Sequence, residues 1–385
     1  MRFGVDATGW NNRRGFGRFT RNAVRRLVET DLENDYVLLV DQLDGETFPA
    51  RGALRMLGTR RPASETARAG SSRGIADILR STRTTRRERF DAILFPSLHA
   101  WFPAPGAPAV IGIHDTISED LPGLAFPRRR DRALWGVKQR LAVRSARRVF
   151  TVSEAARNAV HERLGLPSEA VAVVPEAPDL VFSPRPASEV AAALVEIGAP
   201  ERYVLYAGGI SPHKNVTGLV DAYAAMVPRI ADAPSLVLVG ALEGETFAST
   251  AVEVRERIAR HGLDRRVLLP GFVTDETLAR LYTGATVVVN PSLGEGFGLP
   301  AVEAAACGAA LVLSDLPAHR ESLGDAAIFV TAGDASALAS ALERVLGDQE
   351  LRRSLGAQAR ERVAARTWDA AGVALAELLR EAARR

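Results

Sequence analysis

The sequence predicts an α/β protein made of two doubly wound, Rossmann-like domains, and three observations carry the prediction. Stretches dense in β-branched and aliphatic residues alternate with stretches of helical periodicity, in two successive blocks. In both blocks a strand leads through a glycine-rich turn into a helix, which is the arrangement of nucleotide-binding sheets. The 385 residues suffice for two domains that each have a core of their own.

The first block, residues 1–180, opens with a strand, a glycine-rich loop and a helix. Residues 41–89 are rich in arginine, serine, threonine and glycine, so we interpret them as a variable excursion with a short helix near 75–80. Ser153 is placed to cap the helix that follows the strand at 148–153. We expect strands at 2–7, 36–40, 92–95, 109–113, 148–153 and 171–175, and helices at 16–30 and 126–148.

Prolines between Pro175 and Pro186 mark a linker, which we place at residues 181–200 together with a short helix at 189–197. The second block, residues 201–366, repeats the alternation, and a final helix begins near Trp368. We expect strands at 203–207, 236–239, 267–269, 285–289, 310–313 and 328–330, and helices at 251–261, 276–282, 301–307, 335–346 and 351–365.

The composition is that of a soluble globular protein, with 47% hydrophobic and 25% charged residues. No apolar stretch is long enough to cross a membrane, and the chain enters a strand pattern at once without a signal peptide, so we expect a cytoplasmic protein. The net charge of +3 is modest, and we expect no nucleic-acid partner. The single cysteine, Cys307, excludes an internal disulfide.

The stretch from Asn290 to Gly308 is the centre of the predicted site. Its glycines let the backbone approach a ligand closely, and Pro300 suits the first position of the following helix. Free backbone N–H groups and the helix dipole would favour an anion such as a phosphate. Glu295 and Glu303 frame this loop, and hydroxyl groups are the natural donors to carboxylates. Phosphates flanked by hydroxyl-rich sugars describe a nucleotide diphosphate sugar.

A simpler interpretation of each glutamate stays open. Glu303 would stabilise a helix N-terminus wherever it occurred, and Glu295 could be a solvated residue of a turn. The complete string of glycines with two glutamates eight positions apart is much more specific than either residue alone.

The string N-P-S-L-G-E-G-F-G-L-P-A-V-E resembles the donor-site signature of the retaining glycosyltransferases of family GT4. Their GT-B fold has two Rossmann-like domains facing each other across a cleft. The resemblance covers nearly the whole chain and implies that Glu295 contacts the transferred sugar and Glu303 the ribose hydroxyls. It also implies that residues 367–385 cross back to the first domain. The loop amides that would contact sugar and phosphate are those of Gly296, Phe297, Gly298 and Leu299.

A second loop resembles the phosphate-binding turn of the same family. The strand that opens the second block ends in Gly208 and Gly209, and Lys214 follows at the entrance of a helix. The resemblance implies that this ammonium neutralises the diphosphate as the leaving group gains charge. Many relatives carry an arginine at or near Gly209 as a second cation, and this chain does not.

Three further segments resemble ligand-binding parts of the family. Gly15 and Gly17 belong to the turn after the first strand, which borders the donor phosphates and the acceptor. Phe272 and Val273 follow a strand where the backbone would read the nucleotide base. The segment I-H-D-T-I places His114 at the end of a central strand, where it would touch the donor sugar.

We therefore expect a retaining, metal-independent hexosyltransferase of glycan, polysaccharide or glycoconjugate biosynthesis that needs no cofactor. The catalytic residues would be His114, Lys214 and Glu295. The departing phosphate oxygen would help to deprotonate the acceptor on the same face of the sugar. The sequence has no Asp-x-Asp pair to hold a bridging metal. GDP-mannose is the donor that the resemblance favours, and a glycan, a lipid-linked saccharide and a small molecule stay open as acceptors.

Arginine clusters at 13–26 and 128–148 are typical of solvated surfaces and would also suit an anionic acceptor or the inner face of a membrane. Three other functions stay open. A glycoside hydrolase would use two carboxylates without phosphate-binding loops. A sugar-nucleotide epimerase of GT-B architecture would convert the donor without an acceptor. A catalytically silent partner protein would bind the nucleotide sugar and leave it unchanged.

Overall fold

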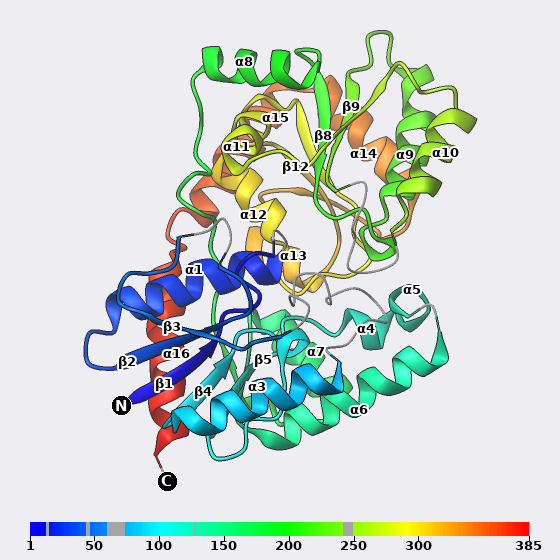
Figure 1. The fold of residues 1–385 in the computed structure, drawn as a ribbon. Helices are drawn as coiled ribbons and strands as arrows, with labels where there is room; N and C mark the ends of the chain where they lie inside the picture. The colour runs from blue at the N-terminus through cyan, green and yellow to red at the C-terminus, as the bar shows by residue number, and fades with distance from the viewer. Residues whose placement is uncertain (13–14, 44–46, 60–73, 127, 242–248, 385) are drawn as a thin grey trace. The chain divides into compact units, whose positions relative to one another are not determined.

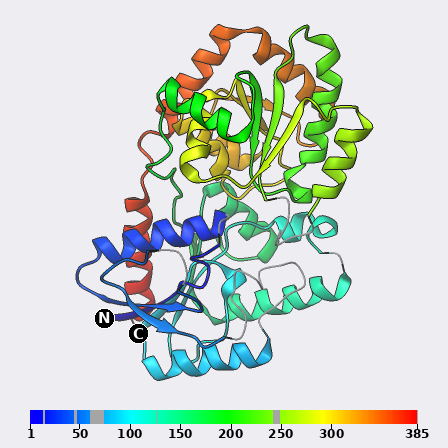
Figure 2. The same cartoon turned by 45° about the horizontal axis from the view of Figure 1, so that its top comes forward.

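The computed structural model describes residues 1–12, 15–43, 47–59, 74–126, 128–241 and 249–384. Unit 1 comprises Met1–Glu176 and Thr367–Arg385, and unit 2 comprises Ala177–Arg366. Each unit is a parallel sheet with helices packed on its faces, as Figures 1 and 2 show. The predicted α/β class with two doubly wound units is therefore confirmed.

The sheet of unit 1 has seven strands in the order β3-β2-β1-β4-β5-β6-β7. The order runs outward from the neighbours β1 and β4, so the topological switch lies between them. The central strands are buried along almost their whole length, which explains their continuous apolar runs. The strands are β1 (Arg2–Asp6), β2 (Asp35–Val40), β3 (Ala53–Met56), β4 (Ala92–Phe95), β5 (Ala109–Gly112), β6 (Ala146–Thr151) and β7 (Val171–Val173).

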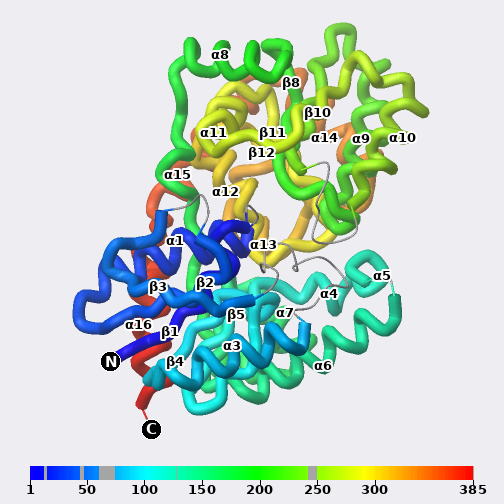
Figure 3. Tube along the Cα trace, in the orientation of Figure 1, coloured from blue at the N-terminus to red at the C-terminus, as the bar shows by residue number. Residues whose placement is uncertain are grey.

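The last helix of the chain belongs to unit 1. The chain leaves this unit after Glu176, builds unit 2 and returns as α16, the red helix in Figure 3. The helices described in unit 1 are α1 (Gly15–Thr30), α3 (Ile75–Glu88), α4 (Ile117–Asp120), α5 (Pro122–Ala125), α6 (Arg129–Ser145), α7 (Glu154–Leu164) and α16 (Trp368–Ala383). Helix α7 begins as expected, because the Ser153 hydroxyl accepts a hydrogen bond from the Ala156 N–H.

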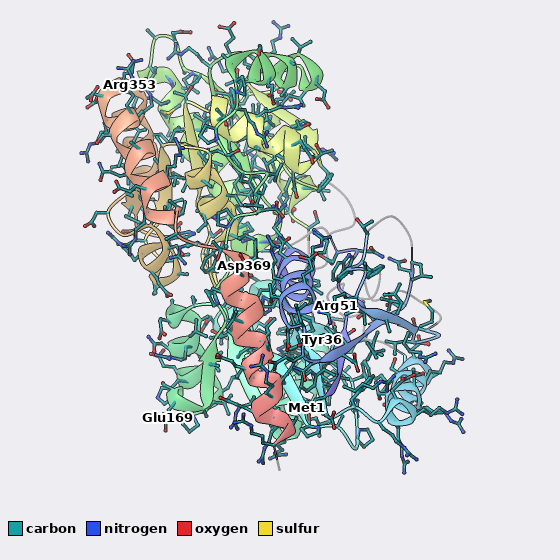
Figure 4. The ribbon with its side chains drawn as sticks, turned by 90° about the vertical axis from the view of Figure 1, so that its left-hand side faces the viewer. Met1, Tyr36, Arg51, Glu169, Arg353 and Asp369 are labelled. Carbon is teal, nitrogen blue, oxygen red and sulfur yellow. The ribbon has the colours of Figure 1, made fainter. Side chains whose placement is uncertain are left out.

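Helix α16 is held against α1 by close packing and ion pairs. The Trp368 ring meets Phe19 edge-on at 6.0 Å between centroids. Gly372 allows the two helices to approach, because a Cβ there would lie 2.9 Å from backbone atoms of α1. Asp369, at the start of α16 in Figure 4, pairs with Arg26 at 3.2 Å. These contacts join the end of the chain to its beginning.

Unit 2 repeats the architecture with six strands in the order β10-β9-β8-β11-β12-β13, so its switch lies between β8 and β11. There Val204 pairs with Val287 and Leu205 with Val288. The strands are β8 (Tyr203–Ala207), β9 (Ser235–Val239), β10 (Val267–Gly271), β11 (Val287–Asn290), β12 (Leu311–Ser314) and β13 (Ile328–Val330). The helices described are α8 (Ala187–Ile197), α9 (Val216–Met226), α10 (Ala251–Arg260), α11 (Asp275–Gly284), α12 (Leu299–Ala306), α13 (Pro317–Leu323), α14 (Ala335–Gly347) and α15 (Gln349–Val363).

The stretch expected as a linker, residues 181–200, is part of unit 2. Its helix α8 packs on α11, where Gly284 leaves room for the side chain of Val190. Glu189 of α8 also pairs with Arg280 of α11 at 3.3 Å. The prolines therefore mark the entry into the second unit rather than a separate connection.

Several elements were not expected from the sequence, among them the short helices α4 and α5, strand β3 and helix α13. Strand β3 and helix α13 both lack an apolar pattern. Strand β3 is an edge strand whose four residues are all exposed. Helix α13 buries the polar residues His319 and Ser322. Helix α3 is also longer than expected and reaches Glu88, whereas residues 60–73 of the expected excursion lie outside the described ranges. Within the part of the chain that the structure describes, no helix is long and apolar enough to span a bilayer.

Candidate functional site

The strongest pairing of predicted site residues lies at the carboxyl edge of the unit 2 sheet, where the strand order reverses. Lys214 ends a short 3-10 turn, Pro212–Lys214, that follows β8, and Glu295 lies in the loop after β11. The Lys214 Nζ donates to Glu295 Oε1 at 2.7 Å. Both groups are largely removed from water, with 17% and 7% of their side chains exposed. The two residues proposed to meet the diphosphate and the sugar are thus in direct contact.

Glu295 is held in its charged form. Its Oε1 also accepts from the Ser292 hydroxyl at 2.8 Å and from the Asn290 amide at 3.3 Å. Burial alone would raise the pKa of Glu295, but the Lys214 ammonium and then His319 outweigh it, and the pKa falls to about 2. The carboxylate is therefore a hydrogen-bond acceptor at neutral pH.

The loops after β8 and β11 are tied together as one structure. The Leu293 N–H donates to the His213 carbonyl at 2.7 Å, and the Asn215 amide donates to the Pro291 carbonyl at 3.3 Å. Asn215 adopts a left-handed conformation with φ of 53°, which turns the chain into α9. These bonds hold the lysine and the glutamate in a fixed relation.

The loop ends at Gly298, which is the N-cap of α12 with φ of 86°. A Cβ there would lie 2.7 Å from the Cδ2 of His319, so glycine is required both by conformation and by space. Pro300 has no N–H, and the N–H groups of Ala301 and Val302 donate to the Gly298 carbonyl, so the Leu299 N–H and the helix dipole are the features of this helix start that suit an anion. Glu303, in the same helix, is 3% exposed.

Helix α13 supports the loop from below through residues that the sequence did not single out. His319 Nδ1 donates to the Ser314 carbonyl at 2.8 Å, and the Ser322 hydroxyl donates to the Phe297 carbonyl at 3.2 Å. Burial lowers the pKa of His319, and the nearby Glu295 carboxylate opposes that shift. Arg366 covers the Phe297 ring, with its guanidinium carbon 5.3 Å from the centroid. The sequence did not predict these contacts, because it did not predict helix α13.

The remaining predicted residues of unit 2 lie along the same sheet edge. The Tyr206 hydroxyl donates a hydrogen bond to the Gly209 carbonyl at 2.6 Å. A Cβ at Gly240 would lie 2.2 Å from the Gly208 carbonyl. The ends of β8 and β9 are therefore packed closely. Phe272 and Val273 follow β10, and Phe272 is 48% exposed. Strand β9 separates them from the Lys214 loop.

In unit 1, His114 lies at the carboxyl end of β5. Its Nε2 donates to the Pro96 carbonyl at 2.7 Å, which leaves the lone pair on Nδ1. Nδ1 lies 4.0 Å from Oε1 of Glu176, a buried residue that the sequence did not single out. Burial lowers the pKa of His114 to about 4, so the ring is neutral at pH 7. Glu176 comes shortly after β7. Its position at the end of a strand is the one feature of the sequence that could have marked it as a candidate site residue.

The two glycines of the first turn differ in what they do. A Cβ at Gly17 would lie 1.9 Å from the Asn12 carbonyl, so this glycine is required where α1 packs on the preceding turn. At Gly15, no described atom lies within 4 Å of the same position. Gly17 therefore has a structural requirement that Gly15 lacks.

Part of the arginine cluster at 13–26 stabilises unit 1. The Arg21 guanidinium donates to the Trp10 and Asn12 carbonyls at 2.6 and 2.7 Å. Arg26 pairs with Asp369, as described above. Arg13 and Arg14 lie outside the described residues.

The site of unit 2 combines an anion-binding helix start, an ammonium group and two buried carboxyl-bearing residues. By their chemistry, the first two features suit an anion such as a diphosphate, and the third suits hydroxyl groups. It occupies the switch point of a parallel sheet, where α/β proteins bind nucleotides.

Comparisons with known proteins agree with this chemistry. A family model described as Glycosyl transferases group 1 matches residues 194–362, and one described as Glycosyltransferase Family 4 matches residues 13–182. The chain is 30% identical over 226 residues to the O-antigen chain mannosyltransferase B of Escherichia coli, and the match covers 58% of each protein. The chain therefore spans somewhat more than half the length of that curated relative.

Solved structures share the fold over nearly the whole chain. Sucrose-phosphate synthase from Thermosynechococcus elongatus superposes with a TM-score of 0.78 at 19% identity, covering 99% of this chain and 98% of that chain. Anabaena HepE in complex with UDP and glucose gives a TM-score of 0.75 at 21% identity, covering 98% of this chain and 99% of that chain. The two family models together match most of the chain and show the family, and the two solved structures show the fold. This chain belongs to the group 1 glycosyltransferases of family GT4 and has their GT-B fold.

Proposed function

We propose that this glycosyltransferase is a retaining, metal-independent hexosyltransferase that uses a nucleotide diphosphate sugar as its donor. The observation that carries the proposal is the Lys214–Glu295 pair beside the start of α12. The pair supplies a cation for the diphosphate and an acceptor for a sugar hydroxyl at one place. Unit 2 would hold the donor, and unit 1 would supply His114 and the acceptor surface.

The proposed chemistry follows from the charges of these residues. The bond between the sugar and the diphosphate breaks, and the leaving oxygen gains negative charge that Lys214 and the Leu299 N–H at the start of α12 stabilise. The same oxygen accepts the proton of the acceptor hydroxyl, which attacks from the face that the diphosphate leaves. Glu295 would orient the sugar through its hydroxyls and would stay ionised throughout, in keeping with its low pKa.

Mannose from GDP-mannose is the donor that we propose first. The mannosyltransferase of Escherichia coli supports the sugar by its name, whereas the HepE structure contains UDP and glucose. The residues of the site do not favour one base over the other. UDP-glucose is therefore the alternative donor to be compared directly.

A peripheral contact with the inner face of a membrane is a second proposal, which α6 supports. Leu134, Val137 and Leu141 lie on one stripe of this helix and are 65%, 50% and 50% exposed. Exposed arginines, Arg130 and Arg144, continue the stripe at its two ends. Apolar groups beside arginines suit an anionic lipid surface. The acceptor would then be lipid-linked, in preference to a free glycan or a small metabolite.

The membrane proposal is tested by cosedimentation with vesicles that contain anionic lipid, compared with vesicles of neutral lipid alone. We expect binding to the first, and we expect Leu134→Ser with Leu141→Ser to reduce it. Equal recovery of the wild type and the double variant with anionic vesicles would contradict the proposal.

The donor proposal is tested by calorimetric titration with GDP, UDP, ADP and dTDP and their common sugars, first without metal and then with magnesium. We expect metal-free binding of one nucleotide, weakened in Lys214→Ala and Glu303→Ala. Binding without transfer to any acceptor of a panel would favour a silent partner protein. Conversion of the donor sugar without acceptor would favour an epimerase, and no binding at all would overturn the proposed function.

A further inference from the structure

The ring of His319 lies against the N-terminus of α12 and turns one nitrogen toward it. Nδ1 donates to the Ser314 carbonyl at 2.8 Å, which fixes the orientation of the ring. Among the residues that the structure describes, none forms a hydrogen bond with Nε2, although the side chain is fully buried. A Cβ built on Gly298, the N-cap of α12, would lie 3.1 Å from this Nε2. The nitrogen is therefore aimed at the helix start that suits an anion.

A buried polar atom without a partner is unusual, because it costs stability. The Ser314 carbonyl can only accept, so Nδ1 keeps its proton whether the ring is neutral or charged. Nε2 is then the nitrogen that gains or loses a proton. A second proton would lie on the edge of the ring that faces Gly298, so the ring can respond to a change of charge at the helix start.

The charges already present at the site do not suffice for a diphosphate. The Lys214 ammonium is paired with the Glu295 carboxylate at 2.7 Å, so the two charges largely cancel. A nucleotide diphosphate sugar brings a negative charge on each of its phosphates. One lysine that is shared with a glutamate cannot neutralise both, and a buried charge without compensation is costly. A further positive charge is therefore needed when the diphosphate binds.

His319 responds to the charges that surround it. Burial lowers its pKa, the Glu295 carboxylate opposes that shift, and the Lys214 ammonium adds to it. Negative charge brought to the helix start would raise the pKa of the ring in the same way as Glu295 does. The other charged or titratable side chains that α12, α13, α15 and the turn after α15 bring to this region are Glu303, Arg320, Glu321, Arg362 and Arg366.

We propose that His319 takes up a proton when a nucleotide diphosphate sugar binds, and that it thereby supplies the second positive charge of the donor site. The inference rests on the proposed function, in which the start of α12 receives the diphosphate. The proton comes from the solvent and binds the lone pair of Nε2, while Nδ1 keeps its hydrogen bond to Ser314. Because the ring is buried, it acts on the ligand through its charge and not by contact.

The experiment measures proton uptake by calorimetric titration with GDP-mannose, UDP-glucose, ADP-glucose and dTDP-glucose. Each titration is repeated in buffers of different ionisation enthalpy at about pH 7, where a histidine with a pKa at or below about 6.5 is mostly neutral. Sugar nucleotides are suitable probes because both phosphates are esterified, whereas the terminal phosphate of a free nucleotide itself titrates near about pH 6. We expect the wild type to take up more than about half a proton for each sugar nucleotide bound.

The variant His319→Asn should abolish this uptake. Asparagine can place its amide where Nδ1 lies and still donate to the Ser314 carbonyl, but it gains no proton. At about pH 7 the variant should bind the sugar nucleotide roughly 5- to 10-fold more weakly than the wild type. At about pH 9, where the wild-type ring is also largely neutral, the difference should shrink to within about twofold. A merely structural role of the ring would not give a loss that depends on pH in this way.

Two other histidines of unit 2 provide the controls. His261 is at the end of α10, where it pairs with Asp221 at 2.9 Å, and His261→Asn should keep the wild-type uptake. His213 precedes Lys214 and also acts on the charge of Glu295, so it is the competing source of a titrating group. His213→Asn should keep the uptake as well. If His319→Asn does not fold, the wild type and these two variants decide.

Binding of a sugar nucleotide by the wild type without proton uptake would overturn the inference and leave the proposed function intact. The second charge would then belong to a group that is charged beforehand, such as Arg366. Uptake that persists in His319→Asn, or that disappears in His213→Asn or His261→Asn, would assign the proton to another group and overturn the inference too. Binding of none of the four sugar nucleotides would overturn the proposed function, and the inference with it.

Discussion

Lys214 and Glu295 are 81 positions apart in the sequence, yet Nζ of the lysine lies 2.7 Å from Oε1 of the glutamate. The contact forms because β8 and β11 are neighbours in the sheet, and each strand delivers one residue at its carboxyl end. Each side chain satisfies the charge of the other in a site with little exposure to water. A cation for phosphate and an acceptor for hydroxyls are thereby brought to one point.

Removing one partner of this ion pair should destabilise unit 2 and stop catalysis. Lys214→Met leaves the carboxylate of Glu295 buried without its counter-charge, which should cost about 3 kcal/mol of unfolding free energy. Turnover should fall roughly 100- to 1000-fold, because the leaving diphosphate loses its ammonium. Urea unfolding and steady-state kinetics measure the two effects.

The double variant Lys214→Met with Glu295→Met separates stability from catalysis. Removing both charges should restore most of the unfolding free energy, whereas activity should stay as low as in the single variant. A double variant no more stable than Lys214→Met alone would show that the buried charge is not the source of the loss.

Glu303 should contribute to nucleotide affinity more than to fold. Replacing this buried residue by glutamine keeps its shape and removes its charge, so the nucleotide should bind about 10- to 100-fold more weakly by calorimetry. Glu350, 86% exposed in its side chain, provides the control, and Glu350→Gln should bind normally. Glu303 is the fifth residue of α12 and lies beyond its first turn, so the structure does not support the simpler interpretation that it stabilises the helix start. Equal affinities for the wild type and Glu303→Gln would show that Glu303 does not contribute to nucleotide binding.

The two glycines of the first turn should respond differently to alanine. Gly17→Ala forces a methyl group against the Asn12 carbonyl and should lower the unfolding free energy by about 2 kcal/mol or more. Gly15→Ala meets no described atom and places a better helix former in the first turn of α1, so stability should be unchanged or slightly higher. Thermal unfolding of both variants compares them, and equal melting temperatures would refute the steric argument.

Acid should destabilise unit 1 through His114. Burial holds its pKa near 4 in the folded protein, below the usual value near 6.5, so the unfolded chain binds a proton first as pH falls. The contribution of the neutral His114 ring to the unfolding free energy is fully present above about pH 6.5. It is lost as the pH falls from about 6.5 to about 4. From pH 7 to pH 5 this amounts to roughly 2 kcal/mol.

The variant His114→Gln should therefore lose less stability between pH 7 and pH 5 than the wild type. Urea unfolding at both pH values gives the difference. His161 is an exposed histidine of the same unit, and His161→Gln should keep the wild-type pH dependence. If His114→Gln lost as much unfolding free energy between pH 7 and pH 5 as the wild type, another titrating group would be responsible for the acid destabilisation.

Transfer should survive removal of divalent metals. The proposed charge stabilisation comes from Lys214 and the Leu299 N–H at the start of α12, so activity after dialysis against EDTA should stay within about twofold of the untreated enzyme. An enzyme that loses activity in EDTA and regains it with magnesium would show that a metal shares the diphosphate.

Much of the fold could be predicted because its signals are local. A run of apolar and β-branched residues predicts the strand at 203–207, and the capping residue Ser153 predicts the start of the helix that follows it. Strand β3 and helix α13 could not be predicted in this way. The first is exposed along its length, and the second buries a histidine and a serine, so neither shows an apolar period.

The candidate site shows the same division. Glu295, Glu303 and Lys214 stand beside glycines and helix starts, which are local features that indicate anion binding. The sequence did not indicate His319 or Glu176 as site residues, because each acts by contacting a residue that is distant in the sequence. His319 fills the space beneath Gly298, and Glu176 faces His114 from a strand two places away in the sheet.

By itself the sequence determined the fold class, the family and the two loops that carry the proposed donor site. It could do so because strand periodicity, glycine turns and helix starts depend on neighbouring residues. Only the tertiary structure decided that Lys214 pairs with Glu295, that Gly17 is sterically required and that Glu176 faces His114. Contacts of this kind depend on strand order and side-chain packing between distant residues, and these leave no periodic trace in the sequence.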